Sequence, residues 1–313
     1  MGCRHIVVTL FAFVSVARLN AWSIEGHKTV GELARSRLTA ATRAQVVKLL
    51  GNDDLAEVAV WADQVRDSTR HRGPLKDDPE AKAFAKDFPK NPEWHFVDQP
   101  LGLKAYAYDG KFSRDDDVVH IIDLCVAVLE GKPSKITRSQ AIRLLVHFVG
   151  DIHQPLHCAT GYYDLTKLDA PTLVTNPAKV DPKTGDRGAN SLYLTKSQEL
   201  HAYWDDKLVK KLDGNGYDEL ADNLMRKNPA GWKMAGDYHQ WAGAWATESA
   251  AIAEKAYRGV SFGTATLDEK RELDRIEIKL APSYEKTNEA VVANQLAKAG
   301  LRLADLLNHI QWH

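Results

Sequence analysis

Two copies of one short motif carry the strongest chemical signal in the sequence. His147 and Asp151 stand four residues apart, and so do His201 and Asp205. Residues with this spacing share one face of a helix, so each pair presents an imidazole beside a carboxylate. Zinc takes nitrogen and oxygen ligands of this kind at about 2.0–2.2 Å. Each pair is therefore predicted to supply half of a zinc site.

Three further donors lie close to these motifs or upstream of them. His157 follows Pro155, which is expected to end the helix that carries His147. Asp63 lies on a predicted amphipathic helix, and His95 lies in a short segment between turn residues. Each residue alone has an ordinary alternative as a surface or capping side chain. The repetition of the His-x3-Asp motif beside them argues against that alternative for the group.

The elements that must position these side chains are mostly helices. Apolar residues recur at i, i+3, i+4 and i+7 through much of the chain. Ser139 is the predicted N-cap of the helix that leads to His147, and the tract from Tyr162 to Asn190 is irregular, with room for a short hairpin. The fold class is therefore mainly α, with few or no short strands. The length allows one domain or two, and we expect a single compact helical domain. Predicted helices cover 28–38, 43–50, 58–65, 118–129, 139–154, 195–212, 240–257 and 284–308.

The first residues are typical of a secretory signal peptide. Arg4 and His5 precede an apolar run over 6–17, and Ala21 is a small residue suited to cleavage. This run is too short to span a bilayer, and no later segment is apolar enough to serve as a membrane anchor. We expect residues 1–21 to be removed, which leaves a secreted chain of residues 22–313 that begins at Trp22.

The charge balance excludes one way of binding nucleic acid. Removal of Arg4 and Arg18 leaves 39 basic residues against 42 acidic ones. A protein that holds nucleic acid through its overall charge is normally basic. Any contact with phosphate must therefore come from a local site.

Two cysteines, Cys125 and Cys158, remain in the predicted mature chain. An oxidising compartment permits a disulfide between them, and two separate buried thiols are the equal alternative. The sequence leaves both open.

Six motifs in chain order carry a family resemblance. Together they closely resemble the class I nucleases, the zinc-dependent single-strand nucleases and 3′-nucleotidases of fungi, plants and protozoa. The resemblance extends from Trp22 to the C-terminal helix around Gly300. The motifs are Trp22-x4-His27, Trp61-Ala62-Asp63-x2-Arg66, Trp94-His95-x2-Asp98, His147-x3-Asp151-x5-His157, Gly185-Asp186-x-Gly188-x-Asn190 and His201-x2-Trp204-Asp205.

The resemblance implies a cleft with three zinc ions. Asp151 would bridge the first and third ions. The first ion would bind Asp63, His95 and His147; the second would bind His157, His201 and Asp205; the third would bind His27 with the amino nitrogen and carbonyl oxygen of Trp22. An α-amino group must lose its proton to bind metal, so residues left ahead of Trp22 would spoil the third site.

The resemblance also implies the reaction. Asp98 would orient the attacking water, and Arg66 would stabilise the charge that develops on phosphorus. Asn190 is expected to contact the substrate. So is Tyr162, because Tyr162 and Tyr163 closely follow His157 in the sequence, where an aromatic ring could stack on a nucleobase. The activity would be hydrolysis of single-stranded RNA and DNA to 5′-phosphorylated products, together with 3′-nucleotidase activity, by a monomer.

Two features depart from the family pattern. Ala189 stands where a second glycine is usual, and the stretch from His157 to Asn190 is longer than is typical. Both changes fall on the segment expected to border the cleft, so they affect the prediction of substrate preference most.

Two other functions compete with the nuclease. A zinc phospholipase C has a similar trinuclear site, but its last ligand is usually Glu where this chain has Asp205. A non-catalytic secreted zinc-binding protein is the second alternative. Arg66 and Asp98 argue against it, because structural zinc sites are closed and need no such neighbours.

Overall fold

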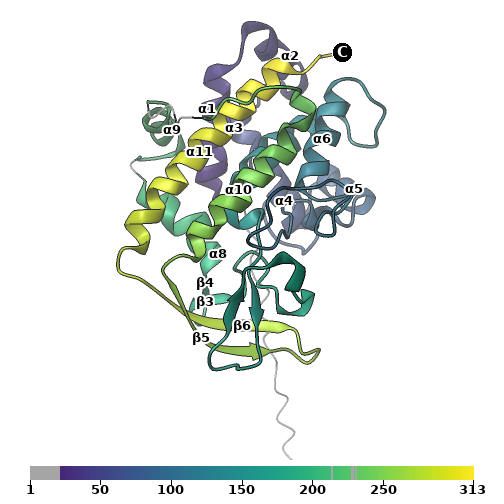
Figure 1. The fold of residues 1–313 in the computed structure, drawn as a ribbon. Helices are drawn as coiled ribbons and strands as arrows, with labels where there is room; N and C mark the ends of the chain where they lie inside the picture. The colour runs from purple at the N-terminus through teal and green to yellow at the C-terminus, as the bar shows by residue number, and fades with distance from the viewer. Residues whose placement is uncertain (1–21, 213, 227–228, 230) are drawn as a thin grey trace, which may run out of the picture.

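Helices make up most of the structure, a computed structural model that describes residues 22–212, 214–226, 229 and 231–313 (Figure 1). This confirms the mainly-α prediction, while the predicted signal peptide, 1–21, lies outside the described residues. The α-helices are α1 (Ile24–Arg37), α2 (Ala40–Leu50), α3 (Leu55–Val58), α4 (Trp61–Ser68), α5 (Pro79–Asp87), α6 (Val118–Leu129), α7 (Arg138–Ile152), α8 (Leu200–Ala202), α9 (Tyr217–Met225), α10 (Trp241–Tyr257) and α11 (Tyr284–His309). The short 3₁₀ turns are η1 (Asn91–Glu93), η2 (Pro155–His157), η3 (Pro177–Lys179), η4 (Pro182–Thr184), η6 (Val209–Lys211) and η7 (Tyr238–Gln240), and η5 (Tyr203–Leu208) is a π-helix.

Helix α7 is the centre of the helical body. It contacts α1, α2, α3, α4, α6, α10 and α11, and every residue from 144 to 152 is buried. Its N-cap is Thr137, which forms a capping box with Gln140, so the prediction of Ser139 as the cap is wrong by two residues. Ser and Thr both cap helices well. Only Thr137, however, is followed three residues later by a Gln whose side chain can accept a hydrogen bond from the backbone of the cap residue.

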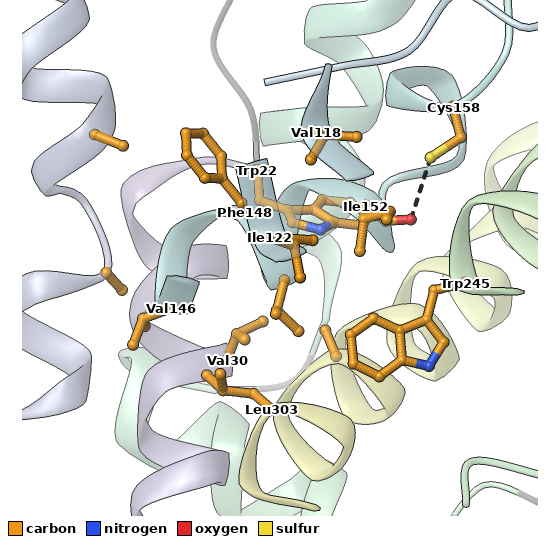
Figure 2. Packing of buried hydrophobic residues seen from close by; sticks show 14 of the residues in the cluster. Trp22, Val30, Val118, Ile122, Val146, Phe148, Ile152, Cys158, Trp245 and Leu303 are labelled. Atoms are coloured by element: carbon orange, nitrogen blue, oxygen red, sulfur yellow. Dashed lines mark hydrogen bonds between the residues drawn. The ribbon is translucent and has the colours of Figure 1, made fainter. Parts of the chain in front are cut away.

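Helices α1 and α11 pack closely beside α7. Gly300 makes the close approach possible, because a Cβ at this position would collide with the side chain of Leu33. The interior between these helices is filled by large apolar side chains, among them Trp22, Phe148 and Trp245 (Figure 2). The indole Nε1 of Trp22 donates to the carbonyl oxygen of Gly150 at 3.0 Å, which ties the start of the described chain to α7.

The two cysteines occur as separate buried thiols, so the thiol alternative is the one observed. Cys125 lies on α6, and the Cys158 thiol donates to the carbonyl oxygen of Ile152 at 3.3 Å (Figure 2).

Strands gather at one end of the helical body, at the bottom of Figure 1. β1 (Tyr162–Asp164) and β2 (Thr172–Val174) pair antiparallel with Tyr162 opposite Val174, as expected for a short hairpin in the irregular tract. A four-stranded sheet has the order β4-β3-β6-β5, in which β3 and β6 are parallel. Its strands are β3 (Leu192–Thr195), β4 (Gln198–Glu199), β5 (Val260–Leu267) and β6 (Leu273–Leu280).

This sheet corrects the predicted helix over 195–212. The segment instead contains the end of β3, β4, then α8, η5 and η6 in succession. Strand β5 and strand β6 were not predicted, although Ile276, Ile278 and Leu280 alternate with charged residues along β6. That period of two is the pattern of a strand with one buried face, and two of these three side chains are buried.

Candidate metal centre

The first cluster of metal-binding side chains joins three separate elements. Asp63 comes from α4, His95 from the segment after η1, and His147 from α7. The His95 Nδ1 lies 3.1 Å from the His147 Nε2, and the Asp63 Oδ1 lies 3.5 Å from the same nitrogen. Their ligand atoms are close enough together to hold one metal ion.

The second cluster surrounds the end of η2 and the start of the π-helix. The Nε2 atoms of His157 and His201 are 3.1 Å apart, and the Asp205 Oδ2 lies 3.3 Å from the His201 Nε2. Gln154 donates to the other oxygen of Asp205 at 2.7 Å and so fixes this carboxylate. Single π-helical turns are frequent at functional sites, and here the turn carries Asp205.

The third cluster contains His27, His147 and Asp151. The Asp151 Oδ1 lies 3.5 Å from the His27 Nε2, while its Oδ2 lies 2.9 Å from the His95 Nδ1 of the first cluster. One carboxylate oxygen therefore faces each cluster, an arrangement suited to a bridging ligand. Trp22 is near this group through Gly150, and Ser23 donates to the Asp205 carbonyl oxygen at 2.8 Å.

The protonation states of the histidines show that the clusters fit cations. The Nδ1 atoms of His147, His157 and His201 each bond to a backbone carbonyl oxygen, at 2.7, 2.7 and 2.6 Å. In the neutral imidazole the proton is then on Nδ1, and the Nε2 lone pair faces the cluster. Two such lone pairs meet at 3.1 Å between His157 and His201, which is unfavourable unless a cation lies between them. Among the described residues, neither ring nitrogen of the buried His27 has a hydrogen-bond partner, so its Nε2, 3.5 Å from the Asp151 Oδ1, is available to a metal ion.

Burial gives these groups strongly shifted pKa values. It lowers the pKa of His27, His95 and His157 well below the usual value. It also raises the pKa of the Asp151 carboxyl to about 6 and that of Asp205 well above its usual range. Burial disfavours every charged form, so His27, His95 and His157 are left without a proton opposite carboxylates in need of a counter-charge. His147 differs, because burial lowers its pKa but the charges of Asp151 and Asp63 outweigh this effect and raise it. Divalent cations satisfy both requirements.

A pocket of about 170 Å³ opens beside the clusters. Its wall includes three residues predicted to act on substrate: Asp98, Arg66 and Asn190. Arg66 is buried and forms an ion pair with Asp63 at 2.6 Å. The full lining is Arg66, Pro92, His95, Phe96, Asp98, Leu156, His157, Arg187, Asn190 and His201.

Asp98 is held in this pocket by a hydroxyl. The Thr160 hydroxyl donates to the Asp98 Oδ1 at 2.7 Å, and Arg114 approaches the other oxygen at 3.8 Å. Burial raises the pKa of Asp98, while the Thr160 hydrogen bond and the charge of Arg114 oppose the rise. The carboxylate is therefore oriented from one side and open to the pocket on the other.

The Gly-Asp-x-Gly-x-Asn motif forms a turn of unusual hand. Arg187, Gly188 and Ala189 have φ values of 56°, 63° and 67°, three consecutive left-handed residues. The Gly188 amide donates to the Thr160 hydroxyl oxygen at 3.1 Å, and its carbonyl oxygen accepts from the His201 Nδ1 at 2.6 Å. The turn thus supports both the second cluster and the hydroxyl that holds Asp98.

Asp186 fixes this turn from within. Its carboxylate accepts hydrogen bonds from the amides of Gly161 and Ala189, at 3.0 and 2.9 Å, and from the hydroxyls of Tyr163 and Tyr257, at 2.9 and 3.1 Å. Buried carboxylates need such partners, and these four hold the loop against the protein interior.

Sequence reasoning did not find Phe96 and Arg187, which line the pocket, or Thr160, which holds Asp98 from outside the lining. Phe96 stands between His95 and Asp98, so its place in that motif was the available signal. Tyr162, in contrast, is buried against Gly185 and is not part of the pocket lining, so its stacking role stays a prediction. Among the pocket residues, Phe96 supplies the aromatic surface.

Comparison with known proteins gives this site its context. A family model described as S1/P1 Nuclease matches residues 22–311. The chain belongs to the S1/P1 nuclease family. It is 26% identical to Endonuclease 1 of Arabidopsis thaliana over 97% of this chain and 92% of that protein. It is 23% identical to Nuclease P1 of Penicillium citrinum over 92% of this chain and 97% of that protein, and 26% identical to Nuclease S1 of Aspergillus oryzae over 66% and 61%.

Membership of the S1/P1 nuclease family makes this chain a hydrolytic nuclease, with nucleic acid as its class of substrate. Three His/Asp groups able to hold metal ions agree with that function. Within the described residues, no helix is both long enough and apolar enough to cross a membrane.

Proposed function

We propose that this nuclease uses three zinc ions to hydrolyse single-stranded RNA and DNA to 5′-phosphorylated products, and that it also releases phosphate from 3′-nucleotides. The observation that carries the proposal is the position of Asp151. Its two oxygens face two His/Asp clusters, which lie beside a pocket lined by Asp98, Arg66 and Asn190. A phosphodiester could enter this pocket and meet the metal-binding residues at its wall.

Zinc is the proposed metal because the donors are imidazole nitrogens and carboxylate oxygens, both of which zinc accepts as ligands. Asp63, His95 and His147 would hold one ion, and His157, His201 and Asp205 a second. His27 and the freed amino group and carbonyl oxygen of Trp22 would hold the third, with Asp151 between the first and third. When bound, zinc supplies positive charge beside the anionic substrate and lowers the pKa of water towards neutrality.

The residues of the pocket then have separate tasks. Asp98, oriented by Thr160, accepts a proton from the attacking water as its oxygen bonds to phosphorus. The bond between phosphorus and the 3′-oxygen breaks, the 3′-oxygen takes up a proton, and the phosphate stays on the 5′ side. Arg66, held by Asp63, faces the negative charge that develops on the phosphoryl oxygens.

The shape of the pocket supports a preference for single strands. Phe96 and Asn190 lie on its wall, where the aromatic ring and the side-chain oxygen of Asn190 would contact a nucleobase. A base that is paired in a duplex cannot stack on a protein side chain without first leaving its partner. Unpaired bases avoid that cost.

We also propose that the working enzyme is a secreted monomer of residues 22–313, released when the signal peptide is cleaved after Ala21. Trp22 is buried next to α7, and its neighbour Ser23 bonds to Asp205. The amino group created by cleavage would therefore be close to the clusters, and an uncleaved chain would lack one ligand.

The deciding experiment uses protein that begins at Trp22, incubated with single-stranded RNA and, separately, with adenosine 3′-monophosphate. Products are followed by chromatography with and without a zinc chelator, and a parallel sample carries Gly-Ser ahead of Trp22. We expect 5′-mononucleotides from RNA and free phosphate from the nucleotide, both abolished by the chelator and strongly reduced by the extension. Cleavage of phosphatidylcholine but not RNA would move the function to a phospholipase C. Three bound zinc ions without any turnover would favour a zinc-binding protein.

A further inference from the structure

Arg187 lines the pocket in a backbone conformation that an arginine rarely adopts. Its φ is 56°, in the left-handed region, where a residue with a Cβ is disfavoured. Such strain is kept where the surrounding structure enforces it, and it is concentrated at functional sites. The residue is exposed, so its side chain does not contribute to the core.

The position of Arg187 is nevertheless fixed. The residues on either side of it are anchored, Asp186 by four hydrogen bonds and Gly188 by Thr160 and His201. Its guanidinium donates to the hydroxyl of the buried Ser191 at 2.9 Å. A cationic group is thus presented at the pocket on a rigid backbone.

Arg187 differs in its partners from Arg66, which also lines the pocket, and from Arg114, which approaches Asp98. Arg66 has Asp63 within 2.6 Å, and Arg114 has Asp116 within 3.3 Å and Asp98 within 3.8 Å. No ion pair of the described residues includes Arg187. The charge of Arg66 and that of Arg114 are compensated by the protein, whereas the charge of Arg187 is left for a ligand.

The surroundings of Arg187 indicate where that ligand would lie. Burial raises the pKa of Asp98 and of Tyr193, and the positive charge of Arg187 is among the groups that oppose the rise in both. Asp98 and Arg187 both line the pocket, whereas Tyr193, over whose ring Arg275 stacks at 4.0 Å, lies outside its lining. A strand that leaves the pocket in this direction would pass Arg187.

We propose that Arg187 is a second phosphate subsite, which binds the phosphate next to the scissile one on a polynucleotide. The inference rests on the proposed function and deepens it, because a 3′-mononucleotide has one phosphate and cannot use this subsite. Guanidinium groups bind phosphate through paired, charge-assisted hydrogen bonds. Arg187 thus makes the enzyme selective for strands over mononucleotides.

The test compares a single-stranded RNA hexamer with adenosine 3′-monophosphate as substrates of the zinc-loaded enzyme. The variants are Arg187→Gln, Arg187→Lys and, as a matched control, Arg271→Gln. Arg271 is also an exposed arginine with a left-handed φ, 60°, but it lies in the turn between β5 and β6, away from the pocket lining. The Arg271→Gln substitution removes one positive charge, as Arg187→Gln does, but leaves the proposed subsite unchanged.

For Arg187→Gln we expect kcat/KM on the hexamer to fall about tenfold, the size of one lost charge-assisted contact, and the loss on the mononucleotide to be at least fivefold smaller. The slope of log kcat/KM against log salt should become shallower by about 0.7 on the hexamer, one phosphate contact fewer. The kcat/KM of Arg187→Lys on the hexamer should lie between those of Arg187→Gln and the wild type, and that of Arg271→Gln should match the wild type. Equal losses on both substrates, or none, would overturn the subsite.

A fourth variant separates the subsite from a structural role. Arg187→Gly removes the guanidinium and also relieves the left-handed backbone, so the Tm should rise by about 2 °C while the hexamer loss persists. A fall in Tm together with equal losses on both substrates would show that Arg187 only maintains the turn. A wild-type enzyme that cleaves neither substrate would instead refute the proposed function itself.

Discussion

Helix α7 and the left-handed turn at 186–190 both position metal-binding side chains, and they do so by different means. The helix uses side-chain spacing: His147 and Asp151 share one face because they are four residues apart. The turn uses backbone: the Gly188 carbonyl oxygen orients His201, and its amide orients Thr160. The side-chain spacing of a helix can be recognised in the sequence as a periodic pattern, whereas the backbone hydrogen bonds of an irregular turn have no such pattern.

That difference gives four predictions, which test how far each region can be changed before the site fails.

The largest effect is expected from Asp151→Asn, on the helical side. An amide is a weaker and uncharged ligand, so the bridge between two clusters would be lost. Metal ions supply several kcal/mol to phosphoryl hydrolysis, and activity should fall by on the order of 10³-fold with less zinc bound. Nuclease rate and metal content by mass spectrometry would measure this. Asp206→Asn, next to Asp205 but paired with Lys210, is the control and should stay within about twofold of the wild type. Full rate with three zinc ions in Asp151→Asn would contradict the bridging role.

Asp98→Asn should be the next most damaging change. The amide keeps the shape but cannot take a proton from water, so kcat should fall by about 10²–10³-fold. The zinc content should not change, because Asp98 belongs to none of the three clusters. Loss of zinc in this variant would show that Asp98 is a ligand, and an unchanged rate would remove it from the mechanism.

The contacts made by the turn at 186–190 are tested by the pair Thr160→Val and Thr160→Ser. Valine has the shape of threonine but no hydroxyl, so Asp98 loses its 2.7 Å hydrogen bond and the Gly188 amide loses its acceptor. We expect kcat to fall about tenfold with KM little changed, and serine to restore most of the rate. A rise in KM alone, or no rescue by serine, would mean that Thr160 acts through packing.

The smallest effect should come from Ala189→Gly, which restores the residue usual in the family. Ala189 has a φ of 67°, where glycine is favoured, so the free energy of unfolding should rise by about 0.5–1 kcal/mol. Urea unfolding would measure it. Ala244→Gly in α10, where alanine is helical and exposed, should lower stability by about 1 kcal/mol. If both changes destabilise equally, the turn is not strained at Ala189.

The helices that carry metal-binding side chains could be predicted well from the sequence, whereas the strands and turns around the site could not. The periodic segments around Asp63, His147 and the C-terminal helix are helices, and the grouped donors meet in three clusters. The segment over 195–212 was wrongly predicted as one helix. Strand β4 pairs with β3, and β3 in turn pairs with β6, a partner about 80 residues away that no local pattern reveals.

The pocket was the least predictable part for the same physical reason. Phe96, Thr160 and Arg187 belong to loops, where spacing carries no information about which side chains meet. Thr160 contacts Asp98 only because the chain returns after α7 to the segment after η1. The hairpin of β5 and β6, by contrast, could have been found from the alternation of Ile276 and Ile278 with charged residues.

The complete burial of α7 from residue 144 to residue 152 has a consequence for the life of the protein in a cell. If the proposed zinc sites are correct, a newly made chain that meets no zinc must enclose ligands whose counter-charge is missing, and we expect that it does not finish folding. Supply of the metal in the secretory pathway would then set how many molecules leave the cell, and not only how fast each one works. Immunoblots of medium from zinc-starved cells should show less protein, and zinc added to the medium afterwards should not bring the missing amount back. Unchanged amounts of an inactive protein would show that the fold forms before the metal arrives.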